Sequence, residues 1–275
     1  MDDPDSDPAR VSRVARPAGS DDPGPWRLEA TSFGLAVQFL TRLPVPWTVP
    51  YSDELAMRAA RYYPLVGALV GLVGALVLWL ATLVFPPLVA VLLSLSATLL
   101  VTGAFHEDGL ADTADGLGGG MDRAKALEIM RDSRIGSYGA IALVVVLGLK
   151  VATLAALPPV LAGIAMICAH GVSRMAAVHV IATTAYARTD AQKFATPKVT
   201  PDGYGWAAAT AVVLVVGAFA CAGAGALLAA AVGFAAMWIM RGALVRKLGG
   251  HTGDGLGAVQ QLSELGLYLG FLAWL

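Results

Sequence analysis

Long apolar runs, separated by short polar segments, dominate this sequence. Six of them approach or exceed roughly 20 residues, the length that a helix needs to cross a bilayer. They are Tyr62 to Phe85, Pro87 to Phe105, Tyr138 to Leu157, Pro159 to Thr183, Trp206 to Ala222, and Ala226 to about Ala243. The runs are continuously apolar and lack the alternation of a membrane β-strand, so they predict helices. We therefore expect an all-α integral membrane protein, a polytopic bundle of about six transmembrane helices.

The two ends of the chain are less regular. The run from Leu262 to Leu275 is short for a span, so it is either a seventh, short C-terminal membrane helix or no span at all. The stretch from Phe33 to Leu43 fits an interfacial or partly inserted segment. Residues 1–26 hold six aspartates and five prolines and lack the features of a signal peptide, so they predict a disordered acidic tail. Residues 27–275 then form a single membrane-embedded domain.

Composition agrees with a membrane protein. Only 14% of the residues are charged, against about 25% in soluble domains, and the mean hydropathy is +0.67. The net charge of −1 and the lack of a basic stripe give no indication of nucleic-acid binding. Cys168 and Cys221 both fall in apolar stretches, so neither a disulfide framework nor a cysteine metal site is expected.

The basic residues predict the topology. The N-terminal 61 residues carry seven Lys and Arg, and the polar segments 106–137, 184–205 and 241–261 carry four, three and three. The turns between them carry none. With six spans, all the charged segments share one face, which the positive-inside rule places in the cytoplasm.

Four ionisable side chains fall inside predicted spans: Lys150, His170, Arg174 and His179. Ionisable groups at membrane depth usually face the bundle interior and often serve function. Lys150 can instead snorkel to the membrane surface.

The segment 105–139 concentrates the acidic residues. Asp108, Asp112 and Asp115 are spaced i, i+4, i+7, which on a helix places them within an arc of about 60°. Three carboxylates on one face repel each other unless they share a cation, and hard oxygen ligands completed by substrate phosphates favour Mg²⁺. The pattern predicts a magnesium site in a cytoplasmic acidic loop.

Phosphate ligands are expected beside these acids. Arg131 and Arg134 follow closely, and the arginine fork suits phosphate oxygens. Lys193 is a candidate from the third cytoplasmic loop, with Arg188 as a lesser one. Asp254 lies among glycines in "GGHTGDGLGA" (249–258), which echoes the sequence around Asp108 and hints at two related half-sites facing each other. Metal-binding acids and phosphate-binding arginines together describe a diphosphate site.

Several motifs resemble one known family. They are "FLTRLPVP" (39–46), "RYYPLVGALVG" (61–71), "HEDGLADTADGLGG" (106–119), "EIMRDSRIGSYGAIAL" (128–143) and "GGHTGDGLGA" (249–258). In this order they are similar to those of cobalamin synthase, the adenosylcobinamide-GDP ribazoletransferase family. The resemblance covers most of residues 33–264. It implies an enzyme of the bacterial inner membrane that uses Mg²⁺ in the last assembly steps of the cobalamin nucleotide loop, with residues 27–275 as its catalytic domain.

The resemblance also implies substrates and roles. Adenosylcobinamide-GDP would be joined to α-ribazole or its 5′-phosphate, with release of GMP, in contact with the lipid bilayer. The ribose hydroxyl that attacks phosphorus must lose a proton, and His106 and Glu107 are the local candidates for the base. Asp108, Asp112 and Asp254 would complete the catalytic set. A homo-oligomer is compatible with this assignment.

Two other functions fit parts of the pattern. A membrane phosphotransferase with a cytidine diphosphate donor also uses helically spaced aspartates, although Asp112 stands where an arginine-containing stretch is expected in such an enzyme. A transporter would suit the half-repeat, Lys150 and Arg174, but its charged groups are expected near the midplane of the membrane rather than at one edge.

Overall fold

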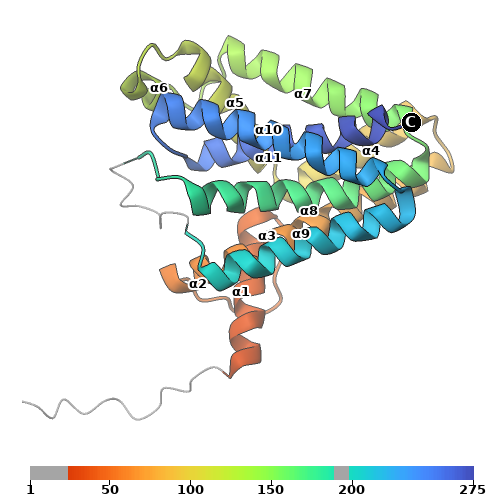
Figure 1. Cartoon of the computed structure of the whole chain (residues 1–275), viewed down its shortest axis with the longest axis horizontal. Coiled ribbons are helices and arrows are strands. Elements are labelled where there is room, and N and C mark those ends of the chain that lie inside the picture. The colour runs from red at the N-terminus through yellow and green to blue at the C-terminus, as the bar shows by residue number, and fades with distance from the viewer. Residues whose placement is uncertain (1–23, 189–197) are drawn as a thin grey trace, which may run out of the picture.

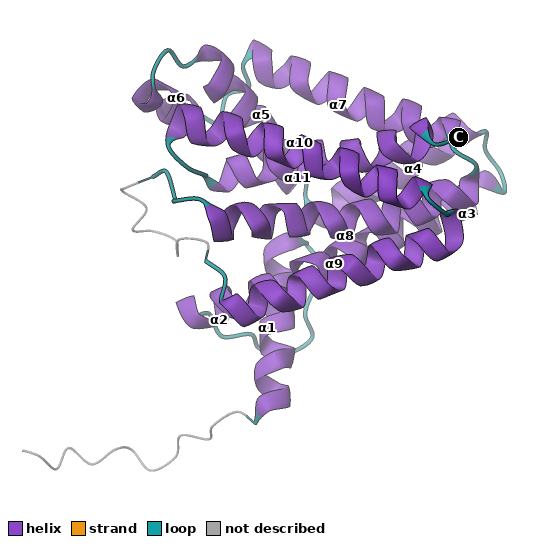
Figure 2. Cartoon of the chain, viewed as in Figure 1, coloured by secondary structure: helices purple, strands orange, loops and turns teal. Residues whose placement is uncertain are grey.

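The computed structural model of the protein describes residues 24–188 and 198–275, and every regular element within these ranges is a helix (Figures 1 and 2). The elements are α1 (Pro25–Leu40), α2 (Asp53–Ala59), the 3₁₀ turn η2 (Ala60–Tyr62), α3 (Tyr63–Thr82), α4 (Pro87–Thr102), α5 (Phe105–Gly119), α6 (Arg123–Ile129), α7 (Ser137–Ala156), α8 (Pro159–Thr183), α9 (Pro201–Ala222), α10 (Gly225–Leu248) and α11 (Gly253–Ala273). The expected all-α fold is confirmed. Residues 1–23 of the predicted tail lie outside the described residues, and α1 begins at Pro25, inside that predicted tail.

The number of membrane spans agrees with the sequence. Five segments of the described chain are long and apolar enough to cross a membrane: Asp53–Thr82, Ser137–Ala156, Pro159–Thr183, Pro201–Ala222 and Gly225–Leu248. The helix α4 alone has only 16 residues, and α5 continues from it after a bend of 88°. Counted with α5, it is the sixth candidate span.

Close helix packing depends on small residues, as is usual where lipid removes the hydrophobic drive to associate. In α3, Gly67 and Gly71 face the backbone of α8 at His170 and Met166. A Cβ on Gly71 would lie 2.8 Å from the Cα of Ile167, so a larger residue would push the two helices apart. The helices α3 and α8 therefore pack closely along each other.

The distribution of polar and apolar side chains is that of a membrane protein. Large apolar side chains such as Val144 and Ile239 are more than 70% exposed. Lys150, Arg174 and Glu264, in contrast, are at most 2% exposed. Lipid explains the apolar exterior, and the charged interior requires that these groups satisfy one another.

The C-terminal helix differs from the prediction. It begins at Gly253, nine residues before the apolar run at Leu262, and most of it is buried against α10, α5 and α8. Gln260, Gln261 and Glu264 lower the hydropathy of its first half, so the apolar pattern marks only the second half. The segment is therefore part of a longer helix inside the bundle, and this helix is not among the candidate membrane spans of the described chain.

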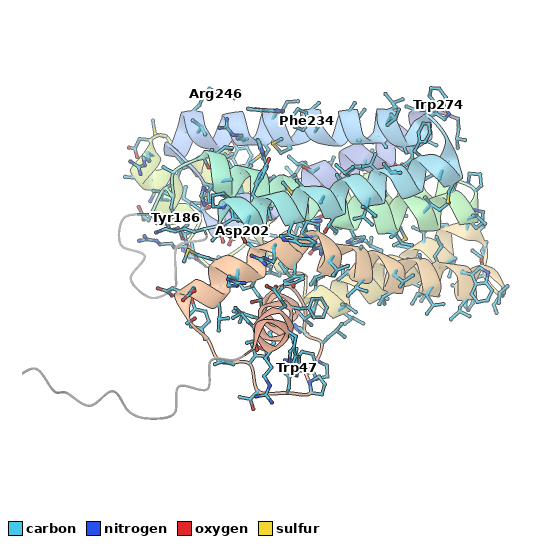
Figure 3. The ribbon with its side chains drawn as sticks, turned by 60° about the horizontal axis from the view of Figure 1, so that its bottom comes forward. Trp47, Tyr186, Asp202, Phe234, Arg246 and Trp274 are labelled. Atoms are coloured by element: carbon cyan, nitrogen blue, oxygen red, sulfur yellow. The ribbon has the colours of Figure 1, made fainter. Side chains whose placement is uncertain are left out.

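The polar segments gather at one end of the bundle. In Figure 1, α5, α6 and the connection from α10 to α11 lie at the left end, and the three short turns after α3, α7 and α9 lie at the right end. Figure 3 shows Arg246 and Tyr186 at the first end and Trp274 at the opposite one. The described parts of the segments 106–137, 184–205 and 241–261 thus share one end of the bundle, and the side of the membrane that this end faces stays a prediction. The helix α1 runs across the bundle axis rather than along it (Figures 1 and 3).

Candidate functional site

The acidic segment is mostly helical rather than a loop. The chain leaves α4 through two residues with positive φ, Gly103 (68°) and Ala104 (55°), and then turns into α5. The first turn of α5 is closed by the amide of Asp108, which donates to the Ala104 carbonyl at 2.9 Å. The predicted cytoplasmic loop is therefore corrected: residues 105–119 form a rigid helix set at 88° to α4.

Two of the three predicted metal ligands stand free on this helix. Asp108 is exposed and Asp112 is half-buried. Within the described residues, neither carboxylate forms a hydrogen bond or a close ion pair. The charges of Asp108, Asp254 and Asp115 all repel that of Asp112. An acidic face on which Asp108 and Asp112 have no close ion pair among the described residues is suited to a cation.

A cavity of about 650 Å³ opens beside this face. Its walls come from the end of α1, the corner between α4 and α5, the first turns of α5, residues 133–135 and α7. The charged residues that line it are Arg42, Glu107, Asp108 and Asp112. A volume of this size is typical of small-molecule sites.

Asp254 is brought to the same acidic face by α11. Thr252 caps that helix by accepting from the Gly255 amide at 3.0 Å, which places Asp254 in the first turn. A Cβ on Gly109 would lie 2.8 Å from the Asp254 carbonyl oxygen, so this glycine permits the close crossing of α5 and α11. A Cβ on Gly257 would likewise lie 3.2 Å from the Cα of Gly109. The two echoing motifs therefore do face each other.

Arg188 pairs with Asp254 across the site. Its Nη2 donates to Oδ2 of Asp254 at 2.7 Å. A short bridge holds the arginine in place: the His251 amide donates to the Ala185 carbonyl at 2.9 Å, and the Ala187 amide donates to the His251 carbonyl at 2.8 Å. Burial raises the pKa of Asp254, and the Arg188 guanidinium partly opposes that rise. Arg188, the weaker of the two phosphate-binding candidates in its loop, thus lies at the candidate site.

Asp115 has a different environment from the other acids. Its Oδ2 accepts from the Gly136 amide at 2.7 Å and its Oδ1 from the Gly139 amide at 2.9 Å. These amides belong to the N-terminus of α7, where a negative charge is favourable. The carboxylate therefore fixes α7 to α5. Its predicted role as a metal ligand stays a prediction.

The metal site as a whole also stays a prediction. No three His, Cys, Asp or Glu side chains of residues 24–188 and 198–275 are arranged as a ready-made metal cage. Mg²⁺ usually takes only one or two protein carboxylates, with water and substrate phosphates as the remaining ligands. Asp108 and Asp112, both oxygen donors without a partner, fit that requirement.

The predicted phosphate-binding residues are not all brought together. Arg134 is exposed, and its guanidinium grips Asp132 with Nη2 to Oδ2 at 2.6 Å. This arginine holds the pKa of Asp132 down at about 2. Arg131 is exposed, and it is not without a partner. Neither lines the cavity, although their neighbour Ser133 does. Lys193 lies outside the described residues.

The two candidates for the base, His106 and Glu107, differ in their position relative to the cavity. His106 is only 5% exposed and does not line the cavity. Glu107 does line it, with its Oε1 accepting from Gln261 at 2.7 Å. The other oxygen of Glu107 is buried without a hydrogen-bond partner in the described structure.

Behind Glu107 lies a buried polar network that connects α5, α7, α8 and α11. Lys150 donates to Glu264 at 2.8 Å and to Gln261 at 2.7 Å. Gln260 donates to Glu264 at 2.6 Å, and Gln261 joins the network to Glu107. Lys150 is thus an interior ion-pair partner, and the alternative that it snorkels is wrong.

Arg174 and His170 flank the same network. Arg174 donates to the His170 carbonyl at 2.7 Å, and His170 Nδ1 lies 3.5 Å from the Glu264 carboxylate. His179, which the sequence groups with them, instead contacts the Tyr204 hydroxyl at 2.9 Å. The interior therefore holds a structural charge network, and His179 is separate from it.

Comparison with known proteins identifies the family of the chain. The sequence profile of the cobalamin-5-phosphate synthase family matches residues 32–272. The chain belongs to the cobalamin-5-phosphate synthase family.

Relatives named adenosylcobinamide-GDP ribazoletransferase are similar over nearly their whole length. The protein of Leptothrix cholodnii is 50% identical over 89% of this chain and 96% of its own. Those of Ralstonia nicotianae and Shewanella amazonensis are 47% and 44% identical, over 88% and 89% of this chain and 95% of each relative. No solved structure matches the chain.

Several residues of this cobalamin-5-phosphate synthase site are absent from the sequence prediction. Arg42 lines the cavity, and the motif "FLTRLPVP" is its only signal in the sequence. Gln260, Gln261 and Glu264 follow directly after the motif "GGHTGDGLGA". A polar triplet within an otherwise apolar C-terminal helix is the signal that could have identified them.

Proposed function

We propose that the protein is an adenosylcobinamide-GDP ribazoletransferase that joins adenosylcobinamide-GDP to α-ribazole, or to its 5′-phosphate, and releases GMP. Membership of the family and the names of its relatives support this function. The observation that carries the mechanism is the cavity whose wall presents Asp108 and Asp112 without hydrogen-bond or ion-pair partners among the described residues. Those groups are suited to a substrate that brings a diphosphate with a bound cation.

The reaction is a phosphoryl transfer with one bond made and one broken. A ribose hydroxyl of α-ribazole attacks the phosphorus attached to the cobinamide. The bond from that phosphorus to the bridging oxygen breaks, and GMP leaves with the bonding electrons. The hydroxyl proton goes to a base. Such reactions depend chiefly on positioning and charge neutralisation.

Asp108 and Asp112 would hold the divalent cation, which we expect to be Mg²⁺. When bound, it would neutralise charge on the diphosphate and on the departing GMP. Asp254, across the crossing of α5 and α11, adds a third carboxylate to the same face, and Arg188 limits the negative charge there. Asp115 acts by fixing the start of α7 beside the acidic face.

Glu107 is the better placed of the two base candidates. It lines the cavity, Gln261 donates to its Oε1, and its buried Oε2 has no hydrogen-bond partner among the described residues. His106 neighbours it in sequence but is not a lining residue. We therefore assign the proton acceptor to Glu107.

The family and the apolar helices make this a membrane protein with bacterial relatives. We further propose that it lies in the inner membrane with the cavity on the cytoplasmic side. The basic residues gathered at the end that carries α5 and α6 support this orientation. No nucleic acid is involved, and the oligomeric state is open to a size measurement of the purified protein.

A direct assay tests the function. The purified full chain is supplied with adenosylcobinamide-GDP, α-ribazole and Mg²⁺, and released GMP is measured. We expect GMP in proportion to enzyme and none after chelation with EDTA. Absence of GMP, together with CMP release from a cytidine diphosphate lipid precursor, would identify the protein instead as a lipid phosphotransferase.

A further inference from the structure

Arg42 is the one cationic side chain that lines the cavity in the described part of the chain. The remaining charged lining residues are the acids Glu107, Asp108 and Asp112. A diphosphate with its cation carries charges of both signs, so it needs an acidic wall for the cation and a basic group for the phosphate oxygens. The acidic face of α5 supplies only the first of these.

The position of Arg42 is fixed by the end of α1. Thr41 terminates that helix, and its hydroxyl donates to the Val37 carbonyl at 2.7 Å. The amide of Arg42 then donates to the Val101 carbonyl at 2.7 Å, which joins the end of α1 to the last turn of α4. The backbone of Arg42 is therefore held against the corner from which α5 begins.

The side chain of Arg42 lies over Gly103 at this corner. A Cβ on Gly103 would be 2.8 Å from the guanidinium carbon, so the arginine lies directly against this glycine. Gly103 also has a φ of 68°, which favours glycine at this position. The contact with Gly103 places the guanidinium beside the start of α5.

The guanidinium of Arg42 has no hydrogen-bond or ion-pair partner among residues 24–188 and 198–275. Most other arginines of these ranges do have partners, as Arg134 has Asp132 and Arg188 has Asp254. Arg42 shares a cavity with three carboxylates, yet none lies within ion-pair distance. The cavity thus keeps its positive and negative walls apart, with room for a ligand between them.

We propose that Arg42 binds phosphate oxygens of the diphosphate in the nucleotide donor. This inference rests on the proposed function and specifies the donor side of its site. The fork of a guanidinium matches two phosphate oxygens, and a lysine cannot reproduce that geometry. Arg42 thereby takes the role that the sequence assigns to Arg131, Arg134 and Lys193.

Two other roles for Arg42 are chemically reasonable and have different consequences. A cation at the end of α4 interacts favourably with the helix dipole, which would make Arg42 structural. Because Arg42 is exposed, its guanidinium can also meet the phosphate of the acceptor or of an anionic lipid. The experiment therefore has to distinguish the donor diphosphate from the acceptor phosphate, from a lipid phosphate and from a purely structural role.

The test compares Arg42→Gln and Arg42→Lys with the wild-type chain in detergent and in vesicles with and without anionic lipid. We expect Arg42→Gln to raise the KM for adenosylcobinamide-GDP by about 10- to 100-fold, the range of a lost charge-assisted hydrogen bond. Arg42→Lys should give a smaller increase. The KM for α-ribazole and the melting temperature should stay close to wild type. Equilibrium dialysis with labelled GDP should show the same loss of affinity without turnover.

Arg246→Gln is the matched control, because Arg246 is an exposed arginine at the same end of the bundle that does not line the cavity. It should leave both KM values unchanged. An unchanged KM for the donor in Arg42→Gln would overturn the proposal. Three other results would also overturn it. The first is a lowered melting temperature with an equal rise in the KM for both substrates, which would make Arg42 structural. The others are a KM change confined to α-ribazole 5′-phosphate and a KM change seen only with anionic lipid. A wild-type chain that releases no GMP would instead refute the proposed function, while GDP binding would still test Arg42.

Discussion

Two groups of carboxylates, one on the cavity wall and one in the interior, are treated in opposite ways by this fold. Glu264 is buried, and its oxygens receive hydrogen bonds from Lys150, Gln260 and Tyr268 at 2.6 to 3.1 Å. Asp108 and Asp112, on a helix that packs against the one carrying Glu264, receive none within the described residues. A buried charge has to be paired if the fold is to survive. A carboxylate left without a partner at the edge of a cavity is therefore available to a ligand.

The largest effect on activity is expected from Asp112→Asn. Loss of one carboxylate that holds the cation should reduce turnover by about 10²- to 10³-fold, since such groups supply several kcal/mol of transition-state stabilisation. The fold should be retained or slightly stabilised, because the change removes repulsion from Asp108 and Asp254. GMP release and the melting temperature are measured on the same preparation. Asp132→Asn is the control, because Asp132 pairs with Arg134 and does not line the cavity; its turnover should be close to wild type.

Changes in the interior network should reduce stability and leave turnover nearly unchanged, the reverse of what we expect for Asp112→Asn. Lys150→Met leaves the charge of Glu264 buried without its ion-pair partner, which typically costs about 3–5 kcal/mol. We expect a lower melting temperature and a poor yield of folded protein, with near-normal turnover per folded molecule. Adding Glu264→Gln removes the unpaired charge and should recover part of the stability. If the single variant melts like the wild type, Glu264 is not held by Lys150 as the structure describes.

The sequence predicts the helices of the bundle better than it predicts how they meet. Continuous apolar runs bounded by prolines set the spans, and the bounds of α8 agree at both ends. The beginning of α11 is missed because Gln260, Gln261 and Glu264 are among its buried residues, and hydropathy cannot distinguish polar side chains turned inward from a surface segment. Its partners, Lys150 and Glu107, are more than 100 residues away in the chain.

In the candidate site, too, the sequence predicts what depends on neighbouring residues and misses contacts between residues that are far apart in the chain. Helical spacing is enough to place Asp108 and Asp112 on one face of α5. It cannot reveal that Asp115 is taken up by amides of α7, because Gly136 and Gly139 come close only through the tertiary fold. Arg188 reaches Asp254 because residues 185–187 pair with His251. Such contacts depend on the assembled bundle.

Asp115 shares a feature with each group of carboxylates: it lies on α5 with Asp108 and Asp112, but its oxygens receive hydrogen bonds as those of Glu264 do. Asp115→Ala removes two backbone hydrogen bonds to a charged acceptor, which contribute about 1.5–3 kcal/mol each. We expect a lower melting temperature and faster hydrogen exchange at the start of α7. Asp115→Asn keeps one acceptor oxygen and should fall between. Should Asp115→Asn instead melt normally but require much more Mg²⁺ for half-maximal turnover, Asp115 belongs with the ligands of the cation.

Arg134 should give the smallest effect and marks the outer limit of the site. Its guanidinium is bound to Asp132 and exposed to solvent, where such pairs contribute little. Arg134→Gln is therefore expected to change the KM for adenosylcobinamide-GDP by less than about twofold. The comparison with Arg42→Gln in the same assay is informative, because both variants lose one positive charge. Arg42 lines the cavity, whereas Arg134 lies between two lining residues without lining it itself. A large increase for Arg134→Gln would mean that the segment 131–134 moves over the cavity when the donor binds, which would return the phosphate contact to the arginine that the sequence favours.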